Sequence, residues 1–330
     1  MELMLRYDFI TSPIGAPTST LIATALEQAA WADKKGFTTI QLPEHHGATC
    51  GYNPSPLTLA GAFAARTQTM RIHPILLLPF YDAVRLGEDL CMLDQASNGR
   101  MDVSIVLGYV PSEFEMFGLE LDDRGRLADE KLSVLQQIFQ GQDFDFAGRH
   151  GRVVPGPVQP GGPPLFIGGS VKASARRAAR FGSAFYPLGA TPELLAEYEN
   201  ACAALGKTPR VMNGDVAETT IYVTDDPDRA WAQVAPHIAV MHGFYTNASH
   251  SSGQNTGFKD VGDYADLRQL NRYLVLTPDD CIALCRSEAA KGNYIVICPL
   301  IGGTPPELSW PSLELFADKV LPALRPPAAA

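Results

Sequence analysis

The stretch FTTIQLPEHH, residues 37–46, combines an apolar strand-like run with three ionisable side chains at its end. A segment with helical spacing, residues 19–35, precedes it. Ionisable groups at the carboxyl end of a strand make a poor core, but α/β barrels place their active sites there. Histidine titrates near neutral pH, so His45 or His46 is suited to move a proton during a reaction. Taken alone, Glu44-His45-His46 is equally compatible with a polar surface turn.

Strand-like apolar runs alternate with helical segments along the chain. The predicted strands are 7–10, 39–42, 71–78, 101–107, 165–167, 184–186, 218–223 and 294–298. The predicted helices are 19–35, 55–67, 82–96, 125–140, 171–181, 192–205, 227–241, several pieces within 264–291, and 311–324. This alternation over 330 residues predicts an α/β fold, a (β/α)8 TIM barrel formed by residues 1–330 as a single domain. A doubly wound open sheet is the alternative, but no Gly-x-Gly-x-x-Gly follows the first strand, which disfavours a dinucleotide-binding fold.

Two segments interrupt this alternation. Residues 142–164 (QDFDFAGRHGRVVPGPVQPGGPP) are rich in proline and glycine, which predicts a β-hairpin insertion followed by a stiff connector. Residues 245–262 (YTNASHSSGQNTGFKDVG) are small and polar, which predicts a mobile loop after the seventh strand. A loop at the carboxyl end of a barrel is placed to close over a ligand, and a surface loop without a role is the alternative.

The charge balance disfavours two classes of partner. Lys and Arg number 26 against 36 Asp and Glu, so the formal net charge is −10. Nucleic acid and anionic membranes require a concentrated basic surface, and we expect neither as a partner. One dense basic run has helical spacing and predicts a solvated helix face. It consists of Lys172, Arg176, Arg177 and Arg180.

The composition predicts a cytoplasmic protein without a metal site. The first 20 residues contain no uninterrupted apolar segment, and the longest apolar run, residues 75–80, is too short to cross a bilayer. Six cysteines are dispersed without a Cys-x-x-Cys pair, which is typical of reduced, buried thiols. Cys281 and Cys285 share a helix face, but no histidine lies at ligand spacing beside them.

Residues 163–170, PPLFIGGS, run from a predicted strand into a predicted helix. The two glycines allow a ligand to approach the backbone, and Ser170 is placed as the helix N-cap. No acidic residue stands three positions after Ser170, while the free N–H groups and dipole of the helix start suit an anion. The sequence therefore predicts a phosphate here, held also by the hydroxyls of Ser170 and Ser174. An ordinary helix cap is the alternative.

The strand 101–107 leads into GYVPSEF, residues 108–114. The glycine and aromatic residues of this turn belong to the same end of the predicted barrel as Glu44-His45-His46. A flat aromatic ligand fits against such a strand end, with backbone groups at its polar edge. A loop with one aromatic anchor is the alternative.

Taken together, these segments resemble the bacterial-luciferase-like family of flavin-dependent oxidoreductases. The order and spacing of the shared motifs match over about residues 5–185, and the carboxyl-terminal part fits in outline. The motifs are Glu44-His45-His46, Asn53-Pro54, Ala60, Ala64-Ala65-Arg66-Thr67, Leu77-Leu78-Pro79, Glu88-Asp89, Leu93-Asp94-Gln95, Ser97, Gly99-Arg100, Gly108, Glu113-Phe114, Phe117-Gly118 and Phe166-Ile167-Gly168-Gly169-Ser170.

This resemblance implies a luciferase-like barrel that works as a monooxygenase. Reduced FMN, supplied by a separate flavin reductase, would bind at the carboxyl ends of the strands. It would react with O2 to give a C4a-(hydro)peroxide that attacks a small organic substrate. The resemblance also implies a homodimer that pairs through the helices after the second and third strands.

The resemblance assigns roles to individual residues. His45 matches the family's acid/base position, and His46 would orient His45 or meet the substrate. The expected flavin contacts are Glu44, Ile75, Leu107, Gly108 and Tyr109, with Gly169, Ser170 and Ser174 at the phosphate. The family also implies a non-proline cis peptide in the third strand, near Pro74-Ile75.

The chain departs from the luciferase pattern at Val106 and Leu107, where luciferase has a reactive cysteine and a phosphate-binding arginine. Losing the arginine removes a bidentate phosphate partner, so either FMN binds more weakly or the flavin differs. An F420-dependent reductase or dehydrogenase of the same superfamily is therefore an alternative. A non-catalytic flavin-binding protein is a further alternative, which the retained Glu44-His45-His46 disfavours. Light emission is not expected.

Overall fold

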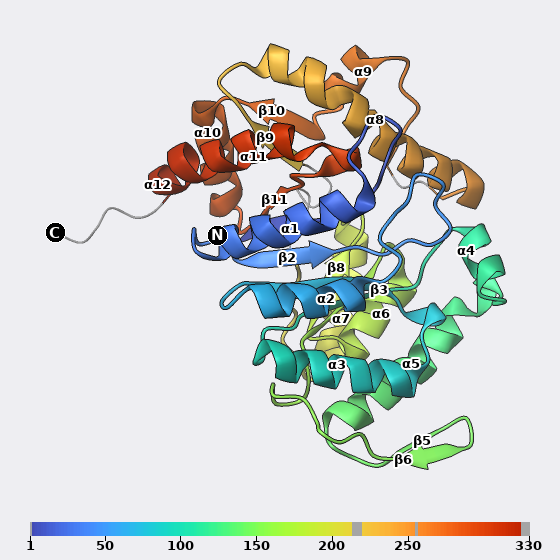
Figure 1. The fold of residues 1–330 in the computed structure, drawn as a ribbon. Coiled ribbons are helices and arrows are strands. Elements are labelled where there is room, and N and C mark those ends of the chain that lie inside the picture. The colour runs from blue at the N-terminus through green and yellow to red at the C-terminus, as the bar shows by residue number, and fades with distance from the viewer. Residues whose placement is uncertain (1, 213–219, 255–256, 325–330) are drawn as a thin grey trace. The chain divides into compact units, whose positions relative to one another are not determined.

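The computed structural model describes residues 2–212, 220–254 and 257–324, and the chain forms two compact units. Unit 1 comprises Met1–Ile40, Ala48–Asn53 and Gly214–Ala330. Unit 2 comprises Gln41–Gly47 and Pro54–Asn213. Figure 1 traces the elements of both units along the chain.

Unit 2 contains a parallel sheet whose strands follow one another in chain order. These strands are β3 (Arg71–Leu77), β4 (Val103–Val106), β7 (Leu165–Gly169) and β8 (Ala184–Pro187). The register aligns Ile75 with Ser104, Ile105 with Ile167, and Ile167 with Phe185. Because the strands are parallel, their carboxyl ends lie at one edge of the sheet. β2 (Thr39–Leu42) ends just before Glu44, at the start of unit 2.

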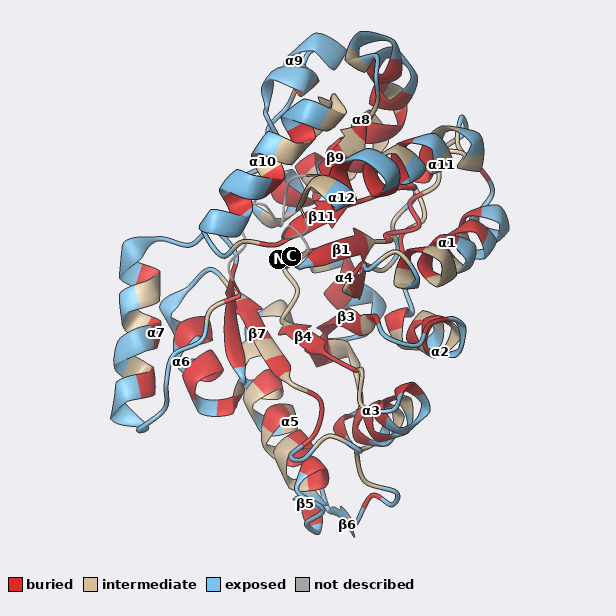
Figure 2. Ribbon diagram, turned by 90° about the vertical axis from the view of Figure 1, so that its left-hand side faces the viewer, coloured by how far each residue is buried: buried red, intermediate tan, exposed pale blue. Residues whose placement is uncertain are grey.

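Helices connect these strands in the right order for a β/α repeat. They are α2 (Pro56–Arg66), α3 (Ala83–Ser97), α4 (Pro111–Met116), α5 (Arg124–Phe139), α6 (Lys172–Phe181) and α7 (Pro192–Ala204), with short 3-10 turns at Leu78–Phe80 and Leu121–Asp123. The core lies between the strands and the apolar stripes of α3, α5 and α6 (Figure 2). Its Leu76, Leu90 and Leu135 are fully buried. Burying a side chain of this size stabilises the fold by about 1.5–3 kcal/mol each.

Arg100 fastens the ends of α2 and α3 in unit 2. Its guanidinium donates to the carbonyls of Ala64, Thr67, Met70 and Ser97 and to the Thr67 hydroxyl, over 2.7–3.1 Å. An arginine presents five donors in a rigid fork, and here all of them meet backbone or hydroxyl oxygens. The Gly99-Arg100 motif therefore has a structural explanation.

Asp94, fully buried in α3, anchors the connector that follows the hairpin. Its carboxylate accepts from the backbone N–H groups of Val158 and Gln159, both at 2.8 Å, and from the Gln159 amide. The proline- and glycine-rich connector is thus held to the helix by a buried charge with three hydrogen bonds. This satisfies backbone groups that have no ladder partner.

Unit 1 contains two parallel strand pairs. β1 (Leu3–Arg6) pairs with β11 (Ile295–Ile297), and β9 (Thr220–Val223) pairs with β10 (Tyr273–Leu276). Its helices are α1 (Thr18–Asp33), α8 (Pro227–Ser252), α9 (Tyr264–Gln269), α10 (Pro278–Ala290), α11 (Pro306–Leu315) and α12 (Leu321–Leu324), with a 3-10 turn at Ile301–Gly303 and a π-helical turn at Phe316–Val320.

One predicted strand lies at other residues in the structure, and one strand in the structure was not predicted. The first strand is Leu3–Arg6 rather than 7–10, because Phe9 has a φ of 58° and breaks the extended backbone. The short run Tyr273–Leu276 is the strand β10, although the segment around it reads as helical. Of the predicted strand 218–223, residues 218 and 219 lie outside the described residues.

The two predicted interruptions have different outcomes. The hairpin is present as β5 (Phe144–Phe146) and β6 (Arg149–Gly151), paired antiparallel. The prediction of a mobile loop at 245–262 is wrong for its first half, because residues 245–252 form the last turns of α8. Burial of Thr246, Ala248 and Ser249 outweighs the weak helix propensity of this polar stretch. The helix ends at Gly253, whose φ is 64°.

The cis peptide expected near Pro74-Ile75 is not found. Within the described residues the cis peptide bond is Val154–Pro155, in the connector after the hairpin. Strand β3 continues through Pro74 and Ile75 as regular extended backbone that pairs with β4.

Candidate functional site

Glu44 is the buried centre of the turn that follows β2. Its Oε2 accepts a hydrogen bond from the backbone N–H of Leu77 at 2.6 Å. Its Oε1 accepts from the Tyr81 hydroxyl at 2.5 Å and lies 3.1 Å from His46 Nε2. Burial and the neighbouring Glu44 carboxylate raise the pKa of Tyr81, so this phenol remains a donor. Glu44 therefore ties the turn to the end of β3.

Glu113 provides the partner of His45. It lies in the first turn of α4 and is buried, with its Oε1 2.8 Å from His45 Nδ1. The same oxygen accepts from the backbone N–H of His46 at 2.9 Å. In the sequence Glu113 belongs to a shared motif without an assigned role, because 68 positions separate it from His45.

The contact with Glu113 decides the tautomer of the His45 ring. A carboxylate oxygen accepts, so Nδ1 carries a proton, and in the neutral ring the lone pair lies on Nε2. The second oxygen, Glu113 Oε2, is buried and has no hydrogen-bond partner among the described residues. A buried carboxylate oxygen without a donor is unfavourable, so this atom is suited to meet a donor from a bound molecule or a water.

Aromatic side chains fix the orientation of both histidine rings. His46 contacts Phe80 and Phe117 edge-to-face at centroid distances of 5.4 and 4.8 Å, and those two rings stack on each other at 4.6 Å. His45 meets Tyr109 edge-to-face at 6.0 Å. The structure thus brings Glu44, His45, His46 and Tyr109 together.

The other residues predicted to contact the flavin lie near the carboxyl ends of β3, β4 and β7, along one edge of the sheet. Ile75 is buried in β3, and Leu107 and Gly108 follow β4. Gly108 has a φ of 78°, and a Cβ there would lie 3.2 Å from the Phe114 ring. On the next strand, a Cβ on Gly168 would lie 2.6 Å from a Val106 methyl carbon. Both glycines are therefore required for close packing at this edge.

The predicted phosphate site needs one correction. Val171, not Ser170, is the N-cap of α6, and Ser170 is an exposed residue of the preceding turn. The Ser174 hydroxyl accepts from the backbone N–H of Val171 at 3.3 Å and donates to its carbonyl at 2.6 Å. The Ser174 hydroxyl therefore already makes two hydrogen bonds. Hydroxyl side chains near the start of a helix commonly bond to backbone groups that have no partner within the helix.

The start of α6 still fits an anion. Its first turn contains no acidic residue and begins with the exposed Lys172. The first N–H groups of a ten-residue helix lack intrahelical partners and carry the positive end of the dipole. A phosphate at this place is compatible with the residues present, and the roles of Gly169, Ser170 and Ser174 stay predictions.

Two other groups have structural explanations. His73 lies in β3 with its Nε2 2.8 Å from the Ser104 hydroxyl, and burial lowers its pKa to about 4. Arg177, predicted as part of a solvated face, is buried, and its Nε donates to Asp129 at 2.6 Å. α6 packs against α5 here, so its basic face is only partly solvated.

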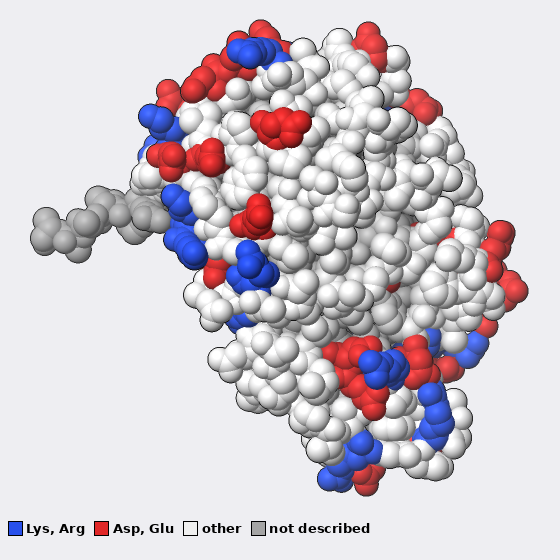
Figure 3. Space-filling view, viewed as in Figure 1, with Lys and Arg blue, Asp and Glu red and all other residues white. Residues whose placement is uncertain are grey.

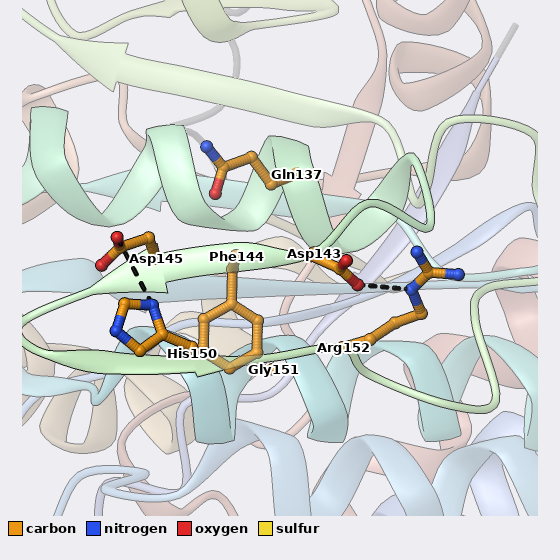
Figure 4. A pocket seen from close by; sticks show the side chains of 7 residues that line it. All are labelled: Gln137, Asp143, Phe144, Asp145, His150, Gly151 and Arg152. Carbon is orange, nitrogen blue, oxygen red and sulfur yellow. Dashed lines mark hydrogen bonds and ion pairs between the residues drawn. The ribbon is translucent and has the colours of Figure 1, made fainter.

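A hollow of about 550 Å³ lies beside the hairpin of unit 2, and none of the site residues described above lines it (Figure 4). It is lined by Gln137, Asp143, Phe144, Asp145, His150, Gly151 and Arg152. Arg152 and Asp143 pair at 2.7 Å, and both are largely exposed. The open, charged walls give no reason to assign chemistry to it.

The described residues hold no group of three or more His, Cys, Asp or Glu side chains arranged for a metal ion. In the same residues no helix combines the length and apolarity needed to cross a membrane. On the face shown in Figure 3, Lys and Arg form small groups interspersed with Asp and Glu.

The sequence is similar to proteins of one family. The family model described as luciferase-like monooxygenase matches residues 9–284. Two relatives from Sinorhizobium fredii, the uncharacterized proteins y4vJ and y4wF, are 29% and 33% identical over 50% and 49% of this chain. Both matches cover 49% of the relative, so the chain spans about half the length of these two relatives.

Two monooxygenases match over more of the chain. The 4-hydroxyprotoasukamycin monooxygenase of Streptomyces nodosus subsp. asukaensis is 24% identical over 94% of this chain and 89% of that protein. The FMNH2-dependent dimethylsulfone monooxygenase of Pseudomonas putida is 25% identical over 79% of this chain and 77% of its own.

Solved structures confirm the predicted luciferase-like (β/α)8 fold. Monooxygenase RslO1 from Streptomyces bottropensis has a TM-score of 0.78 and 24% identity, covering 98% of this chain and 100% of its own. The oxygenating constituent of 3,6-diketocamphane monooxygenase from Pseudomonas putida, in complex with FMN, has a TM-score of 0.72, 20% identity and 99% coverage of both chains. An F420-dependent secondary alcohol dehydrogenase has a TM-score of 0.68 and 15% identity, covering 99% of this chain and 100% of its own.

Proposed function

The chain belongs to the luciferase-like monooxygenase family, and we propose that it is a flavin-dependent monooxygenase acting on a small organic substrate with O2. The observation that carries the proposal is the buried pair of His45 and Glu113, with His45 Nδ1 2.8 Å from the carboxylate. A histidine held by a carboxylate at the end of a barrel strand is an arrangement suited to acid–base catalysis.

Within this proposal His45 is the residue that takes up and returns a proton at Nε2. Glu113 holds the tautomer through Nδ1 and stabilises the ring when it is protonated, as a carboxylate beside an imidazole does. His46, fixed by Glu44 and two phenylalanine rings, orients the turn through its backbone N–H bond to Glu113. Glu44 acts through these contacts as a positioning residue.

The proposed cofactor is reduced FMN. It would supply the electrons that activate O2, and the protein would contribute its binding and orientation. The start of α6 and Lys172 would hold the phosphate, while Ile75, Leu107, Gly108 and Tyr109 would lie along the ring system. The relatives that use FMNH2 or bind FMN support this choice. Leu107 contributes no charge, which favours loose binding of a flavin delivered by a separate reductase.

F420-dependent reduction is the second candidate. The similarity to an F420-dependent dehydrogenase and the absence of an arginine at Leu107 both allow it. In that reaction His45 would again exchange the proton, but O2 would have no part.

Anaerobic titration with reduced FMN and, separately, with reduced F420 tests the two candidates. We expect reduced FMN to bind and the admission of O2 to produce a transient absorbance change that requires the protein. Binding of F420 alone, with no response to O2, would replace the monooxygenase proposal by the reductase. If neither cofactor binds, both candidates fail.

The variant His45→Asn tests the assigned residue. Because general acid–base catalysis contributes about 10²–10⁴-fold, we expect a loss of turnover of that order with reduced-FMN affinity kept within a few-fold. The matched control is His150→Asn, an exposed residue of the hairpin. Equal turnover in the His45 variant and the wild type would remove His45 from the mechanism.

The proposal extends to assembly and location. From the family resemblance we infer a homodimer through α2 and α3, a face that includes the 53% exposed Met92 of α3. Residues 1–330 would act as one barrel domain, which a single cooperative unfolding transition would support. We propose a cytoplasmic location, where the six free cysteines would stay reduced. Light scattering checks the dimer, and Met92→Glu should weaken it.

A further inference from the structure

Glu44 takes up three of the hydrogen-bond donors around the turn that follows β2. Its carboxylate accepts from the Leu77 N–H at 2.6 Å, the Tyr81 hydroxyl at 2.5 Å and His46 Nε2 at 3.1 Å. A carboxylate has no proton to give, so Nε2 carries a proton in the His46 ring. In the neutral ring the lone pair therefore lies on Nδ1, which is the opposite of the arrangement in His45.

Two acceptor atoms of this turn have no hydrogen-bond partner among the described residues. One is His46 Nδ1, because the ring makes its hydrogen bond through Nε2. The other is the buried Glu113 Oε2, while Oε1 of the same carboxylate serves His45 Nδ1 and the His46 N–H. A buried carboxylate oxygen without a donor is unfavourable, so a ligand that supplies a donor is favoured.

The charge of the turn restricts the ligand further. Glu44 and Glu113 are both buried, and the side chains and backbone groups that meet them are N–H and O–H donors rather than lysine or arginine. An anionic group placed here faces two carboxylates at short range, away from bulk water. A neutral O–H or N–H group satisfies an acceptor without that repulsion.

The segment that carries Glu113 is short and is bounded by glycines. The helix α4 has six residues, Pro111–Met116, and Met116 at its end is 65% exposed. On its two sides stand Gly108 with a φ of 78° and Gly118 with a φ of 65°. Glycine adopts a wide range of backbone angles, so this short helix can shift and admit a ligand's donor to the buried oxygen.

We propose that Glu113 Oε2 and His46 Nδ1 select a substrate that carries a neutral hydrogen-bond donor, an O–H or N–H group. Alcohols, amides and protonated phenols belong to this class, whereas carboxylates, sulfonates and aprotic ketones do not. Glu113 thereby contacts the substrate with one oxygen and His45 with the other. That the donor belongs to the substrate rests on the proposed function, whereas the preference for a donor does not.

The test compares benzyl alcohol with benzaldehyde, two probes of similar shape of which the alcohol alone has a donor. Their binding to the full-length protein without added flavin is measured by calorimetry. We expect benzyl alcohol to bind about tenfold more tightly or better, the gain expected for a hydrogen bond to a charged group.

Glu113→Gln changes the acceptor into a donor. Because His45 Nδ1 and the His46 N–H both donate to the Oε1 position, we expect the amide oxygen to stay there and the NH2 group to replace Oε2. The preference for the alcohol should then disappear or reverse. Tyr81→Phe leaves both unpartnered acceptors in place and should keep the preference, as should Glu115→Gln at an exposed position of α4.

Equal binding of the two probes, or binding of neither, would overturn the inference. An unchanged preference in a Glu113→Gln protein that thermal unfolding shows to be folded would overturn it as well. Binding of reduced FMN is measured in parallel. Loss of flavin affinity in Glu113→Gln without any change for the probes would assign the donor to the flavin, which rejects this inference and keeps the proposed function. A donor preference in a protein that binds no flavin would keep this site and reject the proposed function.

Discussion

One carboxylate oxygen, Glu113 Oε1, serves both histidines of the turn: it lies 2.8 Å from His45 Nδ1 and 2.9 Å from the backbone nitrogen of His46. The first contact sets the tautomer of a ring, and the second fixes the backbone that carries the next one. A single substitution at Glu113 therefore tests the proposed proton transfer without removing either imidazole.

Glu113→Gln keeps an oxygen that accepts from the His46 N–H but removes the negative charge beside His45. We expect turnover to fall by roughly 10–100-fold, part of what acid–base catalysis supplies, with the affinity for reduced FMN unchanged. The pH–activity profile should also move toward lower pH, because the amide no longer stabilises the protonated ring. Glu115→Gln, exposed on the same helix, is the control. Loss of flavin affinity instead of turnover would contradict the assignment.

We expect the buried His73 to make the free energy of unfolding depend on pH in the acidic range. Burial keeps the ring neutral down to about pH 4, while in the unfolded chain it gains a proton near pH 6.5. The unfolded state binds more protons between these values, so the free energy of unfolding decreases as the pH falls through this window. The difference corresponds to about 3 kcal/mol. Urea unfolding of His73→Gln at several pH values should show a weaker slope, whereas the exposed His150→Gln should match the wild type. Parallel slopes for both variants would exclude His73 as the cause.

Gly169→Ala should destabilise the protein through both strain and contact. The residue has a φ of 151°, and an added Cβ would lie 2.5 Å from the Ser174 Cβ. We expect a loss of roughly 2 kcal/mol or more. Gly141→Ala separates the two causes, because Gly141 has a φ of 67° but nothing lies within 4 Å of the added carbon. This variant should lower the free energy of unfolding by only about 1–2 kcal/mol. Equal losses in denaturant melts would mean that Ser174 yields to the new methyl group.

Arg100→Lys should destabilise unit 2 although the charge is kept. A lysine offers a single donor group in place of the planar fork, so most of the five hydrogen bonds are lost, at about 2–4 kcal/mol. Arg85→Lys, an exposed position in α3, should change the free energy of unfolding by about 0.5 kcal/mol or less. A melting temperature equal to that of the wild type in Arg100→Lys would show that water replaces the lost bonds.

The sequence was sufficient to predict those elements that are encoded by a local pattern of residues. Glu44-His45-His46 marked the end of a strand, and the spacing of apolar residues located most helices within two residues. Tyr245 shows the limit of such patterns. The helix around it is stabilised by residues far away in the chain, including Tyr52, and a polar stretch gives no sign of them.

The site was predicted only in part, because several of its contacts join residues that are far apart in the chain. The pairing of Glu113 with His45 depends on how α4 folds back, and the sequence shows only that both residues belong to shared motifs. The hydrogen bonds between Ser174 and the backbone of Val171 were not predicted, because they depend on where the helix begins, and the phosphate role of Ser174 stays a prediction. Strand β10 has only four residues and therefore lacks a measurable period.

The contacts of Arg100 have a consequence for how freely this part of the chain can vary. Four of its five acceptors are main-chain carbonyls, which every amino acid supplies. The hydrogen bonds to the Ala64 and Met70 carbonyls therefore do not depend on the identity of those side chains, and only burial limits what can replace them. Ser97 is more constrained, because its hydroxyl also accepts from the backbone N–H of Arg100. One arginine thereby holds the α2–β3 junction mainly through groups that mutation of the neighbouring side chains does not remove.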